Sequence, residues 1–121
     1  MSRVTKRQLE EWLAFWQPAL RLADWDIEVK ACSRKKLEGD DAECYPYPEL
    51  QEAEIRVVSS KPSSALTDHE SILVHELLHC HIDRLRTETN GDVIELVVEI
   101  LSKAVIGLRR SALAEQLKEV A

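Results

Sequence analysis

The apolar positions of this sequence follow a helical period over its first 20 residues. They fall at Leu9, Trp12, Leu13, Trp16 and Leu20. This spacing predicts an amphipathic helix that turns two indole rings inward. Thr5 followed by Gln8 is a capping-box pair at its start. Pro18 predicts that the helix ends or kinks near Gln17.

Three segments then alternate apolar and polar residues with the period of two that is typical of strands. The predicted strands cover residues 25–31, 42–45 and 53–58. Pro46 and Pro48 are expected to stop the second strand, because proline has no N–H to donate to a neighbouring strand. The segment between the first two strands is polar and predicts a solvated turn, and residues 59–65 predict a loop.

The second half of the chain returns to a helical period. Thr67 with Glu70 forms a second capping-box pair, and apolar residues recur at helical spacing over residues 72–85. Asn90 and Gly91 interrupt the pattern, which predicts the end of this helix before them.

A further apolar helix is predicted over residues 92–106, and Gly107 is expected to divide it from an amphipathic segment over 108–120. A helix, a sheet of about three mainly antiparallel strands and then more helices make an α+β fold. No repeat or linker divides the sequence, so we expect one domain over residues 1–121.

The composition narrows the range of partners. The net charge is −6 and the isoelectric point is near 5.2, which argues against a nucleic-acid binder. No apolar run is long enough to cross a membrane, and no apolar stretch follows the basic start as in a signal peptide. Cys32, Cys44 and Cys80 are odd in number and widely spaced, as expected for reduced thiols in a cytoplasmic protein.

The most informative motif is His75-Glu76-Leu77-Leu78-His79, which has the H-E-x-x-H pattern. Residues four apart lie on one face of a helix, so both imidazole rings can reach one metal ion. Glu76 would lie beside the metal as the general base that takes a proton from a bound water. Zn²⁺ suits such nitrogen and oxygen ligands. The alternative is an ordinary helix with two partly buried histidines and a solvated glutamate.

A catalytic zinc site needs a third protein ligand, and Glu95 and Glu99 are the candidates on the next helix. If the first helix runs to Arg86, the rise per residue favours Glu99, whereas an end soon after Ile82 brings Glu95 closer. The alternative is that both belong to a solvent-exposed stripe with Lys103, joined by i,i+4 ion pairs.

Residues 72–81 together with 95–104 resemble small gluzincin-type metallopeptidase-like proteins of phages and prophages. Gluzincins carry the third ligand in an E-x-x-x-D/N/E pattern on the following helix. The resemblance therefore implies a minimal zincin-like domain in which Glu95 binds Zn²⁺ and Glu99 supports a ligand by hydrogen bonding. Glu99 stands where aspartate is common, which leaves room for the two carboxylates to exchange roles.

These features lead us to expect a zinc-dependent metallopeptidase that hydrolyses a peptide or protein substrate. An edge strand, taken to be Ala53 to Val58, is expected to hold the substrate by backbone pairing. Two alternatives remain open. One is a zinc-containing structural or regulatory module without activity, and the other is a helical protein-interaction domain without metal.

Five further residues near the motif receive weaker predictions. Asp83, four residues after the second histidine, either orients that ring or lies on the surface. Tyr45 is expected to serve in packing rather than as an oxyanion donor, and His69 to be exposed near the helix start. Cys80 and His81 point away from the metal-binding face and are expected in packing or surface positions.

Overall fold

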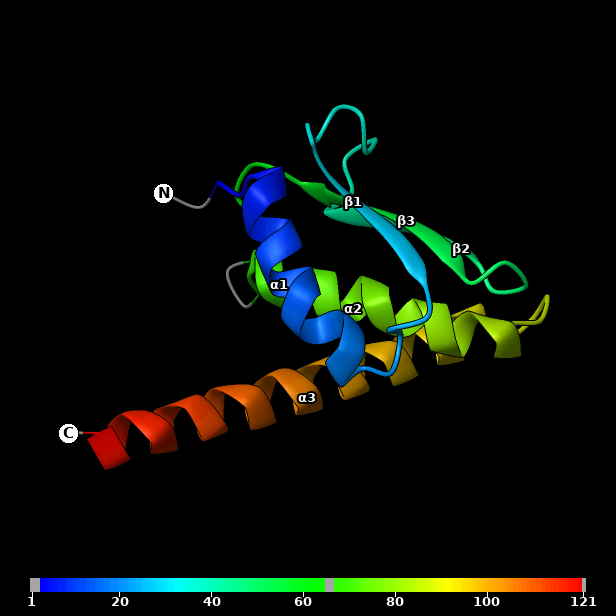
Figure 1. Cartoon of the computed structure of the whole chain (residues 1–121). Coiled ribbons are helices and arrows are strands. Elements are labelled where there is room, and N and C mark those ends of the chain that lie inside the picture. The colour runs from blue at the N-terminus through cyan, green and yellow to red at the C-terminus, as the bar shows by residue number, and fades with distance from the viewer. Residues whose placement is uncertain (1–2, 65–66, 121) are drawn as a thin grey trace.

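The structure, a computed structural model, describes residues 3–64 and 67–120. Helix α1 (Lys6–Ala19) is followed by strands β1 (Asp26–Cys32), β2 (Ala42–Tyr47) and β3 (Glu52–Val58). Helix α2 (His69–Ile82), a 3-10 turn (Asp83–Leu85) and the long helix α3 (Gly91–Val120) complete the chain. The α+β class and the three-stranded sheet are as predicted (Figure 1).

The prediction of a mainly antiparallel sheet is wrong. The strand order is β1-β3-β2, in which β1 pairs with β3 in parallel and β2 pairs with β3 antiparallel. The strand proposed as an edge, β3, is therefore the centre of the sheet, and β2 is one of the two edges. Alternation along one strand shows which side chains are buried but not which strand pairs with it.

Strand β2 also continues through Pro46 to Tyr47, beyond the predicted stop. Pro46 lies opposite Ala53 in the pairing with β3. This is possible because an edge strand has a neighbour on one side only, so the missing N–H of proline need not interrupt a second ladder.

The helices begin and end close to the predicted positions, with three differences. Helix α1 is capped by Thr5, as predicted, because the Thr5 side chain accepts a hydrogen bond from the Gln8 N–H. The helix ends at Ala19, two residues after Gln17. Helix α2 is capped by Asp68 rather than Thr67, because the Asp68 carboxylate accepts from the Ser71 N–H. Helix α2 ends at Ile82, and only a 3-10 turn continues to Leu85.

Gly107 does not divide the last helix, which runs without a break for 30 residues. A single glycine inside a helix costs only about 1 kcal/mol relative to alanine, so the flanking turns can carry the helix through it. The predicted loop over 59–65 is seen as far as residue 64, and its last residue lies outside the described range.

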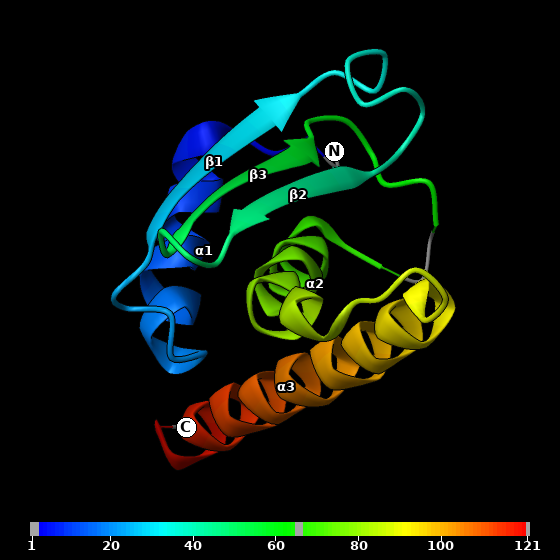
Figure 2. The same cartoon turned by 90° about the vertical axis from the view of Figure 1, so that its right-hand side faces the viewer.

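Helix α2 lies between the sheet and α3, and α1 packs beside it under β1 and β3 (Figure 2). The core forms where these elements meet, around Leu9, Ile55, Leu73, Leu77 and Val98, which are fully buried. The opposite face of the sheet carries charged residues joined in ion pairs, among them Lys30 with Glu54 and Arg56 with Glu54. Within the described ranges, no helix combines the length and apolar character that a membrane span requires.

Candidate metal centre

Both histidines of the H-E-x-x-H motif lie on the side of α2 that faces α3. Their ring centroids are 5.2 Å apart. The His79 side chain is 6% exposed and that of His75 is 21% exposed. Because the core residues Leu73 and Leu77 fix the opposite side of this helix, the two rings are directed to the same place.

Glu95, in the first turns of α3, completes this group. Its Oε2 atom lies 3.4 Å from Nε2 of His75, and its Oε1 atom lies 3.3 Å from Nε2 of His79. One ligand atom from each of the three residues falls within 4.8 Å of the others, so the group could hold a metal ion. Among the described residues, this is the one group found with that geometry.

The end of α2 explains why Glu95 rather than Glu99 reaches both Nε2 atoms. Because α2 stops at Ile82 and α3 starts at Gly91, the connection is short enough to bring the first turns of α3 beside the motif. Glu95 is therefore level with both rings. Glu99, one turn later, contacts the other side of one ring, where its Oε2 atom lies 3.1 Å from Nδ1 of His75.

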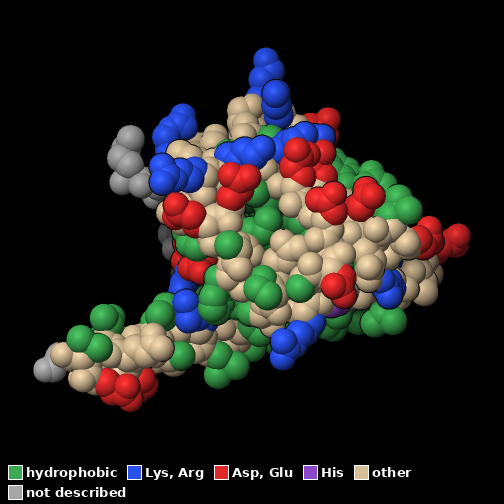
Figure 3. Space-filling model, viewed as in Figure 1, with side chains coloured by type: hydrophobic (Ala, Val, Ile, Leu, Met, Phe, Trp, Pro, Cys, Tyr) green, Lys and Arg blue, Asp and Glu red, His purple; other side chains and the backbone are tan. Residues whose placement is uncertain are grey.

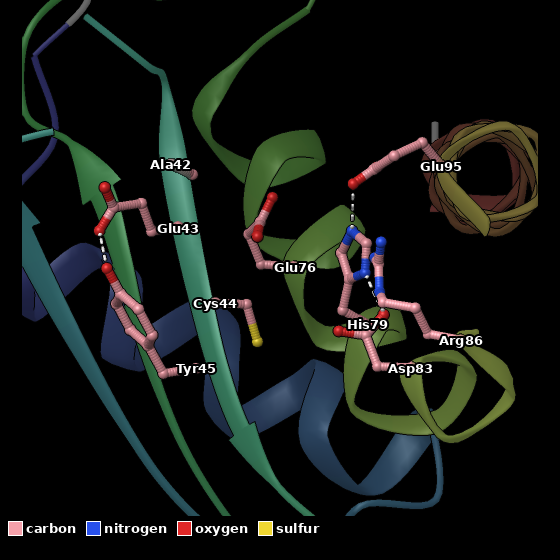
Figure 4. A pocket seen from close by; sticks show the side chains of 9 residues that line it. All are labelled: Ala42, Glu43, Cys44, Tyr45, Glu76, His79, Asp83, Arg86 and Glu95. Atoms are coloured by element: carbon pink, nitrogen blue, oxygen red, sulfur yellow. Dashed lines mark hydrogen bonds and ion pairs between the residues drawn. The ribbon is translucent and has the colours of Figure 1, made fainter. Parts of the chain in front are cut away.

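The His79 ring also has a carboxylate beside its Nδ1 atom. Nδ1 of His79 lies 2.7 Å from Oδ1 of Asp83, one turn later on the same helix. A carboxylate at Nδ1 holds the proton on that nitrogen and leaves the Nε2 lone pair free for a metal. Each of the two rings thus has a carboxylate beside its Nδ1 atom, which is the arrangement that favours metal binding through Nε2. Asp83 also contacts Arg86, which holds the carboxylate in place (Figure 4).

Glu76 points into the space between β2 and Glu95 (Figure 4). Its side chain is only 12% exposed. Burial raises the pKa of Glu76 to about 7, and the negative charges of Glu95 and Asp83 act in the same direction, whereas His79 opposes them. A carboxyl group with a pKa near neutrality can accept and release a proton under ordinary conditions.

Two cavities meet at Glu76. The first, of about 350 Å³, is lined by β2 from Ala42 to Tyr45 and by His79 and Glu95. The second, of about 720 Å³, extends to the other side of His75 and reaches along α3 as far as Arg110. The group of possible ligands therefore lies in an open cleft between β2 and α3 rather than in a closed site.

The stripe of i,i+4 ion pairs considered as an alternative is present only in part. Lys103 pairs with Glu99 at 3.3 Å. Glu95 and Glu99 are about half exposed, with 54% and 47% of their side-chain surface accessible, yet both also contact the histidines.

The other candidates near the motif differ from one another. His69, predicted to be exposed, is 7% exposed, and its ring N–H donates to the Ser60 carbonyl at 2.7 Å. Cys80 is buried as predicted, and His81 is exposed and contacts the Leu20 carbonyl. Tyr45, expected in packing, is 42% exposed, and its hydroxyl donates to Glu43.

The three cysteines are free thiols, as expected from their number and spacing. Cys44 lines the smaller cavity, but the neighbouring Cys80 thiol and burial raise its pKa far above the usual range. Cys44 is not part of the group of possible ligands, which consists of His75, His79 and Glu95.

Sequence reasoning did not identify β2 as a wall of the cleft. The signal was present in Pro46, because proline within a strand is confined to the edges of sheets and an edge strand is free to line a cleft. No protein-family model, curated protein or solved structure matches this chain. What the site does is therefore argued from its own geometry.

Proposed function

We propose that this protein is a zinc-dependent peptidase. The observation that carries the proposal is the paired arrangement at the two histidines, in which each Nδ1 contacts a carboxylate while both Nε2 atoms face Glu95. His75, His79 and Glu95 would hold the ion. Two imidazoles and one carboxylate form a donor set that suits Zn²⁺ and leaves a position open for water or substrate.

Zinc, when bound, lowers the pKa of a water molecule and polarises a carbonyl group. Glu76 accepts one proton from the attacking water at its buried carboxylate. The water oxygen forms a bond to the peptide carbonyl carbon, and the carbon–nitrogen bond breaks. Glu76 then returns the proton to the leaving nitrogen, so that the carboxylate is restored for the next cycle.

The substrate would lie along β2 rather than along β3, which the sheet encloses on both sides. An extended peptide can add to the free edge of β2 through backbone hydrogen bonds. That edge borders the cavity that contains Glu76 and Glu95. The carbonyl to be cleaved would then be held between the general base and the metal ligands.

The test is digestion of a peptide library by zinc-loaded protein, with new termini identified by mass spectrometry. The informative variant is Glu76→Gln, for which we expect full zinc content and no cleavage. Glu49→Gln, at an exposed carboxylate in the turn between β2 and β3, is the control and should cleave like the unchanged protein. Cleavage by Glu76→Gln would remove Glu76 from the mechanism.

A zinc-loaded protein that cleaves nothing in the library would favour the non-catalytic alternative. A hydroxamate that chelates zinc separates the two cases. It should bind an open site and raise the melting temperature, whereas a site closed by four protein ligands has no vacancy for it.

A further inference from the structure

The side of α3 that faces away from the sheet and α2 carries an apolar surface, here called the outer α3 face. Its members share exposure to solvent and lack of charge. They are Val93, Leu96, Val97, Ile100, Leu101, Ala104 and Leu108. Figure 3 shows hydrophobic side chains at several places along the lower edge of the molecule, over this helix. Ile100 and Leu108 are 58% and 72% exposed.

The charged residues of the same stretch lie on other sides of the helix. Glu95 and Glu99 turn toward the histidines of α2, and Lys103 follows them one turn later. The outer α3 face therefore forms an uninterrupted apolar strip of about 22 Å, at 1.5 Å per residue. A helix at the surface of a monomer would normally place its charges on this side.

The exposed apolar area of the outer α3 face can be compared with the area that a protein–protein interface buries. The exposed fractions of these side chains correspond to about 600 Å² per chain, which is the upper end for the largest apolar patch of a monomer. Two such faces in contact would bury about 1,200 Å², the lower limit of a standard stable interface. Complete burial of both faces would therefore reach the size of a small stable dimer interface.

The pattern of the face indicates what covers it. The side chains form two rows with a spacing of four residues, one from Val93 to Leu101 and the other from Leu96 to Leu108. Ridges of this spacing on one helix fit the grooves between the same ridges on another. The seven members of the face carry no charge, and Lys103, which borders the face three residues after Ile100, is paired with Glu99 of its own chain.

We propose that the outer α3 face is the interface of a homodimer with two-fold symmetry. In such an interface the same surface is used by both subunits, so a residue near the axis meets its own equivalent. Ile100 lies at the middle of the strip and is the residue nearest the axis. A single substitution there therefore changes both halves of the contact. The histidines face the opposite direction and stay accessible.

The test is sedimentation velocity over about 1 to 100 µM protein, a range that brackets a micromolar dissociation constant. We expect the unchanged chain to sediment as a dimer. Ile100→Lys should raise the dissociation constant by at least about 100-fold, because a charge would be buried at the centre on both sides. Circular dichroism and metal content should not change, since Ile100 is outside the core.

The matched control is Leu117→Lys. Leu117 is 71% exposed on the same helix, but it lies more than two turns beyond the face and about 100° around the helix from Ile100. It should leave the dimer intact. If Ile100→Lys is misfolded, Leu96→Lys in the same face replaces it.

Three results would overturn the proposal. One is a monomer at all concentrations, another is a dimer that survives both substitutions within the face, and the third is equal dissociation by Leu117→Lys. None of them depends on whether the protein cleaves peptides.

Discussion

Replacing Glu76 with glutamine should stabilise the metal-free protein, and the gain should grow as the pH rises. The carboxyl group has an ordinary pKa of 4.5 in the unfolded chain and a pKa of about 7 in the folded one. Below pH 4.5 the Glu76 carboxyl group is protonated in both the folded and the unfolded state, so it does not lower the free energy of unfolding. Above pH 7 the folded state holds a buried negative charge that the unfolded state exposes to water, so the cost is complete.

The magnitude follows from the two pKa values. A change of one pKa unit corresponds to 1.36 kcal/mol, so the full cost at pH 8 is about 3 kcal/mol and the cost at pH 5 is about 1 kcal/mol. Glutamine has nearly the same shape but no charge to bury. The difference in free energy of unfolding between Glu76→Gln and the unchanged protein should rise accordingly between these pH values.

The assay is urea unfolding followed by circular dichroism at pH 5 and pH 8, with a chelator present throughout. Glu49→Gln removes an exposed carboxylate and should show the same stability difference at both pH values. With zinc bound, the cation stabilises the Glu76 carboxylate, and the gain from glutamine should shrink. A gain that is equal at pH 5 and pH 8 in the metal-free protein would refute the reasoning, because it would mean that Glu76 is not buried as a charge.

Three further outcomes are expected. Glu95→Gln should weaken zinc binding more than Glu99→Gln does. Glu99→Gln should lower the zinc affinity by about 10-fold, because it removes only a partner of one ring. Competition with a chromogenic chelator measures both affinities. Asp83→Asn should weaken zinc binding by about 10- to 100-fold in the same assay, and an unchanged affinity would show that this carboxylate does not orient its ring. Leu73→Ala should lower the free energy of unfolding by about 3 kcal/mol, whereas Leu85→Ala, at a 66% exposed position, should change it little.

Local periodicity predicted the elements of this protein well because burial acts on single side chains. Leu9, Leu13 and Trp16 recur at helical spacing and are all buried. Ala53, Ile55 and Val57 alternate along a strand and are all buried. In each case the side chains that must leave water are marked by their own spacing, and no knowledge of the partner is needed.

The pairing of strands and the exposure of a side chain depend on residues far away in the sequence. The predictions of the sheet pairing and of the exposure of His69 were wrong for this reason. Nothing within β1 specifies that it runs parallel to a strand 26 residues later along the chain, from Asp26 to Glu52. The exposure of His69 was misjudged because its partner, the Ser60 carbonyl, belongs to the preceding loop.

The prediction of the possible metal ligands depended both on local spacing and on contacts between distant parts of the chain. His75 and His79 were predicted from helical spacing alone, which fixes their relative position. The choice between Glu95 and Glu99 depended on where α2 ends, and the sequence left that position open. A 3-10 turn after Ile82 decides the geometry, and no periodic signal precedes it.

The position of β3 has a consequence for how the chain folds. The centre of the sheet is the last of its three strands in sequence, and β1 and β2 do not pair with each other. While the chain emerges from the ribosome, no ladder can form until residues 52–58 arrive. A nascent fragment that ends before Glu52 carries two strands with bare edges, which is the state most prone to pair with other chains. We therefore expect a greater risk of pairing with other chains during synthesis than after folding.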